Sequence, residues 1–416
     1  MKKLLTLALA AGAFFLVGFT MRDLQAARMP STEALGNLLG KPSAEPLTLS
    51  ASGVFGEALA DIERNYAKPV DVSELRYAGI GGMVASLGDP HTMFLEPQMA
   101  QEFALETMGN FVGVGARLTS DPMGAKAVSV FEDGPAMRAG LKPGDVITGV
   151  DGKSVVGWPT DDIVKLIRGE EGTSVVLTVL RTKEAESLDL SMIRRPIVVP
   201  SVESKVLEGS GVGYISVTSF SEPTIDQFSK ALDKMTAASV KGLVIDLRSN
   251  PGGLLNTASE MLSHFLDGQT VVTMRMREGS EQVEKTPRGR VRANMPPVAV
   301  MLDENSASAS EIFAGVLREA NLATLVGDHS YGKASVQNVL PLRDKSSLKI
   351  TIAKYYLPSG ADISRKVDAD GQYISGGLKP DVEVKLNLDQ SPIIGDPNSD
   401  NQLAEAVKVV LGQAKA

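Results

Sequence analysis

Apolar residues in the first quarter of the chain recur at the spacing of an α-helix. They are Phe55, Leu59, Ile62 and Tyr66. Residues three or four apart share one helical face, and residues 75–87 continue the pattern until the glycine and proline of residues 88–90 interrupt it. We therefore predict a helical region over residues 53–108. It follows a Pro-, Gly- and Ser-rich linker over residues 28–52.

The pattern changes to short β-rich runs between residues 109 and 193. These runs cover residues 127–130, 145–150 and 174–180. Turn-forming residues separate them, as is typical of short strands. One helix is predicted over residues 160–167, with Thr160 as its N-cap. Residues 109–193 are therefore predicted to form a compact β-rich domain.

Strands followed by helical stretches recur over residues 194–385. The predicted strands cover residues 213–217, 242–247 and 297–302. Alternation of this kind indicates a mixed α/β core. In the last region, residues 386–416, the apolar positions of residues 401–411 predict an amphipathic helix.

A positively charged start and an apolar run mark the first 27 residues. Lys2 and Lys3 precede an apolar segment over residues 4–19, a pattern typical of a secretory signal. The run is shorter than the ~20 residues that span a bilayer, so a cleaved signal and a retained membrane tether both stay open. In either case we predict export, to the periplasm or cell envelope.

Composition narrows the classes of function. The 50 acidic residues outnumber the 42 basic ones and give a net charge of −8, which argues against nucleic acid as a partner. The chain contains no cysteine. Disulfides, thiol nucleophiles and cysteine zinc sites are therefore excluded.

A serine-rich turn joins the predicted strand at residues 297–302 to the helix that follows it. Ser308 lies where the helix begins, and free N–H groups at a helix N-terminus favour a developing oxyanion. Ser308 and Glu311 also match a capping box, which needs no catalytic role. From this turn alone, both interpretations stay open.

A nucleophilic serine needs a base. The three histidines, His91, His264 and His329, have no evident triad context. A lysine serves as a base when it is neutral, and burial in apolar surroundings lowers its pKa toward 7 or 8. Lys333 follows Gly332 and precedes runs of β-branched residues. A solvated surface charge is the alternative for this lysine.

Residues 134–155 resemble the PDZ domains of secreted bacterial proteases. The two glycines of residues 111–118 interrupt an apolar run, as in a loop whose backbone approaches a ligand closely. The resemblance implies a PDZ fold that binds C-terminal tails of proteins. Its carboxylate-binding loop corresponds to Gly113, Val114, Gly115 and Ala116.

Ser308 and Lys333, together with residues 244–255, resemble the carboxyl-terminal processing peptidases, also called tail-specific proteases. The similarity extends from about residue 87 to residue 384. It implies a serine endopeptidase with a Ser-Lys dyad and an α+β core resembling the ClpP/crotonase-like fold, with the PDZ domain inserted and helical segments at both ends. No metal or cofactor is implied.

The resemblance also assigns a role to each matching residue. Ser308 is the nucleophile, Lys333 the general base, and Gln337 orients the lysine; the oxyanion hole takes its N–H groups from Gly252 or Gly253 and from Ala309. It further implies self-association into a homo-oligomer and a helical-repeat adaptor protein as partner. Protein substrates bound by their C-termini are the expected ligands.

Three departures from the family pattern stand out. Asn305 and Ala334 occupy positions where the family commonly has glycine, and residues 365–375 form a longer loop. Two other functions stay open beside proteolysis. One is a PDZ scaffold on a degenerate protease core, and the other is a hydratase-like acyl-CoA enzyme; the catalytic set disfavours the first and the tail-binding domain the second.

Overall fold

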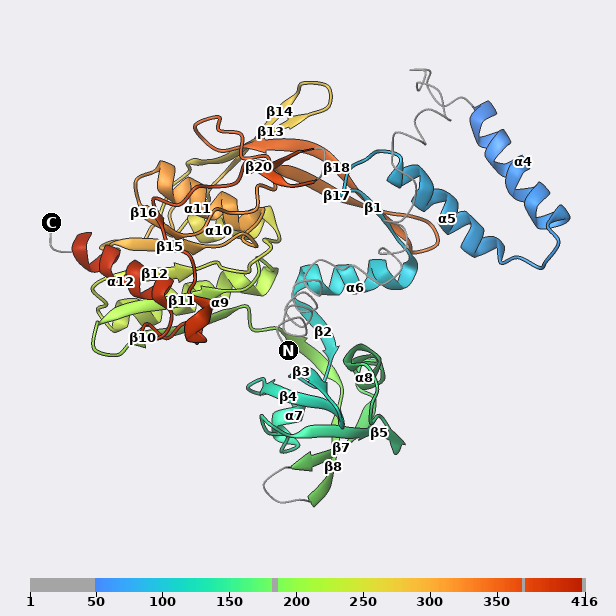
Figure 1. The fold of residues 1–416 in the computed structure, drawn as a ribbon, viewed down its shortest axis with the longest axis horizontal. Helices are drawn as coiled ribbons and strands as arrows, with labels where there is room; N and C mark the ends of the chain where they lie inside the picture. Colours follow the sequence, from blue (N-terminus) through green and yellow to red (C-terminus); the bar gives the residue numbers. More distant parts are fainter. Residues whose placement is uncertain (1–48, 182–185, 369–370, 414–416) are drawn as a thin grey trace. The chain divides into compact units, whose positions relative to one another are not determined.

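The computed structural model describes residues 49–181, 186–368 and 371–413, and Figure 1 shows its ribbon. The predicted export segment and most of the predicted linker lie outside these residues. The described chain divides into two compact units. The first consists of the residues up to Pro97 together with residues 337–351, and the second contains residues 98–336 and those from 352 onward.

The described part of the first unit holds two helices, a short strand and, within residues 337–351, parts of two longer strands. Helix α4 spans Leu49–Asn65 and α5 spans Val72–Ala85, where Asp71 caps the N-terminus. Strand β1 (Met93–Leu95) pairs antiparallel with the first residues of β18 (Ser347–Tyr356). The helical patterns of residues 55–66 and 75–87 correspond to α4 and α5, but the region predicted to be helical, residues 53–108, also contains strand β1. However, α4 begins within the predicted linker, so residues 49–52 are helical.

The β-rich domain of the second unit follows helix α6 (Pro97–Met108). One sheet has the strand order β3-β4-β5-β7-β8, with β6 on β5, and β2 pairs with β9. The strands are β2 (Asn110–Gly113), β3 (Ala116–Asp121), β4 (Gly124–Val130), β5 (Val146–Val150), β6 (Lys153–Ser154), β7 (Ser174–Arg181), β8 (Glu186–Ile193) and β9 (Arg195–Val198). A separate apolar core fills this domain.

Two helices accompany this sheet, α7 (Pro135–Arg138) and α8 (Thr160–Ile167). Helix α8 has the predicted bounds, but the predicted cap is wrong. Pro159 is the N-cap, and the buried hydroxyl of Thr160 has no hydrogen-bond partner within the described chain. Thr160 is already helical, so its side chain does not cap the helix.

The α/β core is built on a six-stranded sheet of order β10-β11-β12-β15-β16-β21. All neighbours from β11 onward are parallel. The strands are β10 (Val202–Leu207), β11 (Val212–Val217), β12 (Leu243–Asp246), β15 (Val298–Leu302), β16 (Ala323–Gly327) and β21 (Val382–Glu383). Strands β12 and β15 are buried along their whole length, as expected of parallel strands covered on both faces.

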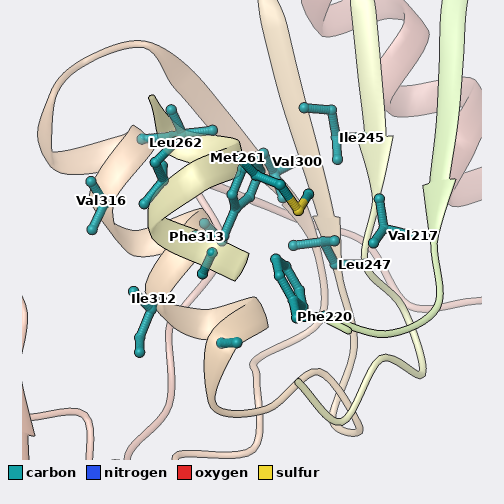
Figure 2. Packing of buried hydrophobic residues seen from close by; sticks show 14 of the residues in the cluster. Val217, Phe220, Ile245, Leu247, Met261, Leu262, Val300, Ile312, Phe313 and Val316 are labelled. Carbon is teal, nitrogen blue, oxygen red and sulfur yellow. The ribbon is translucent and has the colours of Figure 1, made fainter. Parts of the chain in front are cut away.

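Helices cover both faces of this sheet. Each predicted strand is confirmed and is followed by a helix: α9 (Glu222–Ala237), α10 (Leu255–Leu262) and α11 (Ala309–Glu319). These three pack in one core with alternate sheet residues. Figure 2 shows Phe313 of α11 among side chains of α10 and the sheet. The C-terminal helix α12 (Asn401–Gln413), red in Figure 1, packs on the other face.

The remaining elements are short strands and one 3₁₀ helix. They are β13 (Thr270–Met276), β14 (Glu281–Lys285), β17 (Ser335–Pro341), β19 (Lys366–Val367), β20 (Tyr373–Ser375) and η1 (Leu388–Gln390). The longer loop of residues 365–375 thus contains the β19-β20 hairpin. Among the described residues, no helix combines the length and the apolar character that crossing a bilayer requires.

Candidate active site

The candidate catalytic segments follow three adjacent parallel strands and lie at one edge of the sheet. Strand β12 ends at Asp246, β15 at Leu302 and β16 at Gly327. The carboxyl ends of neighbouring parallel strands meet at the same edge, where open α/β sheets bind their ligands. Three segments begin directly after these strands. The glycine turn contains Gly252 and Gly253, the serine turn contains Ser308, and the lysine loop contains Lys333.

Ser308 differs from the other serines of its turn in conformation and in hydrogen bonding. The hydroxyls of Ser306 and Ser310 are buried and donate to the carbonyls of Leu247 and Asn250, at 2.8 and 2.9 Å. Ser308 is half-buried and has φ 56°, ψ −115°. Non-glycine residues avoid this backbone region, and such strain clusters at functional sites. Of the three hydroxyls, that of Ser308 is therefore best suited to react.

The buried carboxylate of Glu311 links the serine turn to the lysine loop. Its Oε2 accepts the backbone N–H of Ser308 at 2.8 Å and that of Lys333 at 2.9 Å. Its Oε1 accepts the Gly332 N–H at 2.6 Å and the Ser330 hydroxyl at 2.5 Å. Burial raises the pKa of Glu311, and the four hydrogen bonds act in the opposite direction. The backbones of Ser308 and Lys333 are thereby held to one oxygen atom.

Tyr355 forms a second bridge between the same two segments. Its hydroxyl donates to the carbonyl of Lys333 at 2.5 Å and lies 3.5 Å from the carbonyl of Ser308. Burial, and then the charge of Glu311, raise the pKa of Tyr355 well above its usual value. The hydroxyl therefore keeps its proton. No local pattern in the sequence indicates this role of Tyr355, although the residue lies within the span of the family resemblance, residues 87–384.

The glycine turn packs directly against Ser308. A Cβ on Gly252 would lie 2.8 Å from both Ser308 Cβ and the amide nitrogen of Ala309, so only glycine fits there. The Gly252 N–H donates to Asn250 Oδ1 at 2.9 Å. The N–H of Gly253, an exposed residue, meets no acceptor within the described chain. Ala309 is the first residue of α11, and its N–H has no intrahelical acceptor.

The remaining catalytic candidates have other partners. Gln337 lies on β17, where its Nε2 donates to Thr351 Oγ1 at 3.2 Å. His264 accepts from Arg292, and burial lowers its pKa to about 4. His329 contacts Asp328 and stacks on the ring of Tyr373, and the backbone of His91 donates to Asp89. The rings of His264 and His329 are thus engaged by residues other than Ser308.

Two residues stand where the family commonly has glycine, and neither has a backbone conformation that requires glycine. Asn305 and Ala334 are absent from the residues with positive φ. Ordinary side chains therefore fit at both positions without strain.

The family resemblance assigns residues 113–116 to a carboxylate-binding loop. In the structure these residues lie where β2 joins β3. Gly113 ends β2, Ala116 begins β3, and Gly115 has φ 81°. The carbonyls of Val114 and Gly115 accept N–H groups of Ala136 and Phe131 within the domain. Strand β3 is an edge strand of its sheet. A peptide can therefore add beside it as a further strand.

Comparisons with known proteins agree with this geometry. The chain matches peptidase family S41 over residues 211–384 and a PDZ domain over residues 127–181. It is 34% identical over 353 residues to the carboxy-terminal processing protease CtpB of Bacillus subtilis, covering 82% of this chain and 71% of that protein. A CtpA-like serine protease of Staphylococcus haemolyticus is 35% identical, covering 79% of this chain and 63% of its own length.

A solved structure supports the fold. The S41 protease from Bacteroides fragilis superposes with a TM-score of 0.52 and 17% identity, covering 90% of this chain and all of that one. This similarity concerns the fold alone.

Proposed function

Because this chain belongs to peptidase family S41, we propose that Ser308 and Lys333 form the catalytic dyad of a C-terminal processing serine protease. The chain is a serine-type peptidase with a PDZ domain. One observation carries the assignment of the dyad. The N–H groups of Ser308 and Lys333 donate to the same oxygen of the buried Glu311.

The reaction is acyl transfer from a peptide to Ser308 and then to water. Neutral Lys333 Nζ takes the hydroxyl proton, Ser308 Oγ attacks the peptide carbonyl carbon, and the protonated lysine gives its proton to the leaving amine as the C–N bond breaks. Water, deprotonated by Lys333, then hydrolyses the ester. In this scheme Gln337, four residues after Lys333, orients the lysine.

The N–H groups of Gly253 and Ala309 are the proposed oxyanion donors. Both groups are free of intramolecular acceptors in the described chain, whereas the Gly252 N–H is engaged by Asn250. Loss of one such donor typically costs 10²- to 10³-fold in rate. The sequence left Gly252 and Gly253 as alternatives, and this hydrogen bond favours Gly253.

The PDZ domain is the proposed selector of substrates. The β2-β3 loop with Gly115 would bind the terminal carboxylate, and the edge of β3 would pair with the tail. Together with the export signal predicted over residues 1–27, this supports processing of protein C-termini in the cell envelope. A ClpP/crotonase-like relationship of the core, self-association, a membrane tether and an adaptor stay predictions.

Two serine variants test the dyad. Ser308→Ala should remove labelling by a fluorophosphonate probe and lower cleavage of an unstructured protein by at least about 10³-fold. Ser310→Ala, two residues away, should keep both activities and lose only stability.

A lysine variant tests the proposed base. Lys333→Arg should be inactive because arginine cannot act as a base at neutral pH. Cleavage by Ser308→Ala at a rate near that of the wild type would refute the assignment.

A further inference from the structure

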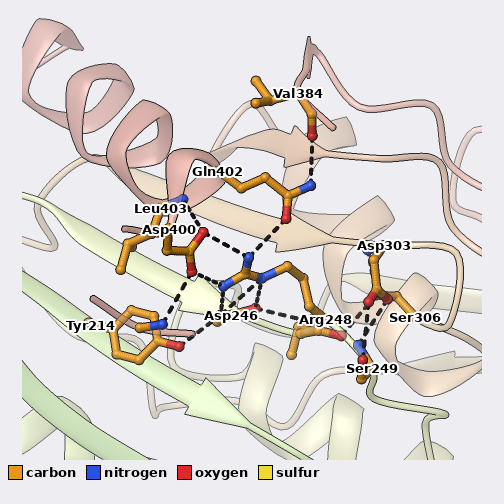
Figure 3. Close-up of polar contacts among 12 residues, drawn as sticks. Tyr214, Asp246, Arg248, Ser249, Asp303, Ser306, Val384, Asp400, Gln402 and Leu403 are labelled. Carbon is orange, nitrogen blue, oxygen red and sulfur yellow. Dashed lines mark hydrogen bonds and ion pairs between the residues drawn. The ribbon is translucent and has the colours of Figure 1, made fainter. Parts of the chain in front are cut away.

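A buried arginine lies at the base of the glycine turn. Arg248 follows β12 by two residues, and its side chain is 6% exposed. Each of its five N–H groups has an acceptor (Figure 3). The bonds are Nε to Asp246 Oδ1 (3.0 Å), Nη2 to Asp246 Oδ2 (2.7 Å) and Asp400 Oδ2 (2.6 Å), and Nη1 to Asp400 Oδ1 (3.1 Å) and Gln402 Oε1 (2.8 Å).

Three of these five bonds go to the segment that opens α12. Asp400 is fully buried, and its oxygens also accept the N–H groups of Leu403 and Gly395, at 3.1 and 3.2 Å. Gln402 Nε2 donates to the carbonyl of Val384 at 2.6 Å. The acceptors of Arg248 are thus fixed by the fold of the C-terminal segment itself.

The hydrogen bonds of this cluster hold Arg248 from two sides. Two buried carboxylates, Asp246 and Asp400, flank one guanidinium, and Tyr214 donates to Asp246 Oδ2 at 2.8 Å. Asp246 accepts two of the guanidinium N–H groups, and Asp400 and Gln402 supply the acceptors for the other three. Buried N–H groups that lose their acceptors are destabilised. The position of Arg248 therefore depends on Asp400 and Gln402 as well as on Asp246.

The residues after Arg248 connect it with the glycine turn and the serine turn. Ser249 has φ 57°, and its N–H donates to Asp303 Oδ1 at 2.9 Å. The N–H of Asp303 also donates to the hydroxyl of Ser306, in the serine turn, at 2.9 Å. Asn250 then holds the Gly252 N–H. The turn is anchored at Arg248 on one side and at Asp303 on the other.

We propose that Asp400 and Gln402 are positioning residues for the glycine turn, which holds the proposed oxyanion donor Gly253. They act on this turn through Arg248. The inference rests on the proposed function. An oxyanion donor has to be placed within ~0.5 Å, and a 1 Å displacement can cost ~10²-fold in rate. Strained turn residues do not hold such a position alone. The C-terminal segment supplies the missing constraint.

Asp400→Asn tests the proposal in the full chain. Asparagine caps a helix as well as aspartate does, so α12 is retained while the charge that faces Arg248 is removed. We expect kcat to fall at least ~10-fold and KM to change less than ~2-fold. Affinity for a peptide aldehyde, whose hemiacetal oxygen occupies the oxyanion hole, should fall by the same factor as kcat.

Val410→Ala is the matched control. Val410 is fully buried on the same helix and has no contact with the guanidinium, so this variant should lose stability but keep kcat per folded molecule. If Asp400→Asn does not fold, Gln402→Met, which removes one neutral acceptor, should lower kcat ~2- to 5-fold. Either variant, folded and with wild-type kcat and aldehyde affinity, contradicts the proposal. An active Ser308→Ala would contradict the proposed function instead.

Discussion

At Glu311, a residue type that is rarely buried has no exposed surface. The sequence presents it as half of a capping box with Ser308, and the structure keeps that bond. The same carboxylate also accepts three donors from the loop at residues 330–333. Its role is therefore to fix the distance between the two segments that carry Ser308 and Lys333.

Glu311→Gln should lower kcat at least ~10-fold. An amide accepts at one end only, and its NH₂ group would face donors at the other, so two of the four bonds are lost. The buried donors left unpaired should reduce the free energy of unfolding by about 1–3 kcal/mol. Initial cleavage rates and urea unfolding measure both effects. Glu304→Gln, at an exposed position in the same turn, is the control, and equal rates for both variants would contradict the role of Glu311.

At the scale of elements, the loop before β3 depends on one backbone conformation. Gly115 has φ 81°, and a Cβ there would lie 3.3 Å from Ile197 Cδ1 and 3.4 Å from Gly134 Cα. Gly115→Ala should therefore displace the loop and weaken binding of a peptide with a free C-terminal carboxylate by ~10-fold, while the amidated peptide binds weakly to both proteins.

Fluorescence anisotropy with a labelled peptide measures this affinity. Gly140→Ala is the matched control, because Gly140 has φ 91° in the same domain and its Cβ would meet open space. It introduces similar backbone strain without touching the loop. Equal affinities for the two variants would show that Gly115 has no part in carboxylate recognition.

The elements that could be predicted from the sequence are those with strong local patterns. The apolar runs of β11, β12 and β15, each followed by a helix, predicted the α/β core. The turn after β15 made Ser308 a candidate, and only the family resemblance assigned it a role. Contacts distant in sequence left no such signal. Glu311 meets donors 19 to 22 residues away, and Tyr355 reaches Ser308 across 47 residues. The choice between Gly252 and Gly253 likewise depended on a side chain, Asn250, whose direction the sequence does not encode locally.

At the scale of the whole molecule, the buried ion pair of Asp400 links stability to pH. Burial acts to raise the pKa of Asp400, but the hydrogen bonds and charge of Arg248 outweigh it and hold the pKa below its usual range. A carboxyl group with a lowered folded-state pKa stabilises the fold above its unfolded pKa of ~3.9. That contribution is lost as the pH falls through the folded-state pKa.

The melting temperature of the wild type should therefore exceed that of Asp400→Asn most at pH 7. The difference should narrow as the pH falls below ~4, because the wild-type carboxylate becomes protonated and neutral like the amide. Thermal scans by circular dichroism between pH 7 and pH 3 measure the difference. A gap that stays constant over this range would show that Asp400 contributes nothing through its charge.

The bond between Arg248 and Asp400 also sets an order of events during synthesis. Asp400 follows Arg248 by 152 residues, and a ribosome that adds ~5–20 residues per second needs ~8–30 s to make that stretch. For the last 67 residues of this stretch, or ~3–13 s, the nascent chain contains both Ser308 and Lys333 while the arginine still lacks its partner. A protease built in this way stays incomplete until its C-terminal segment has been made.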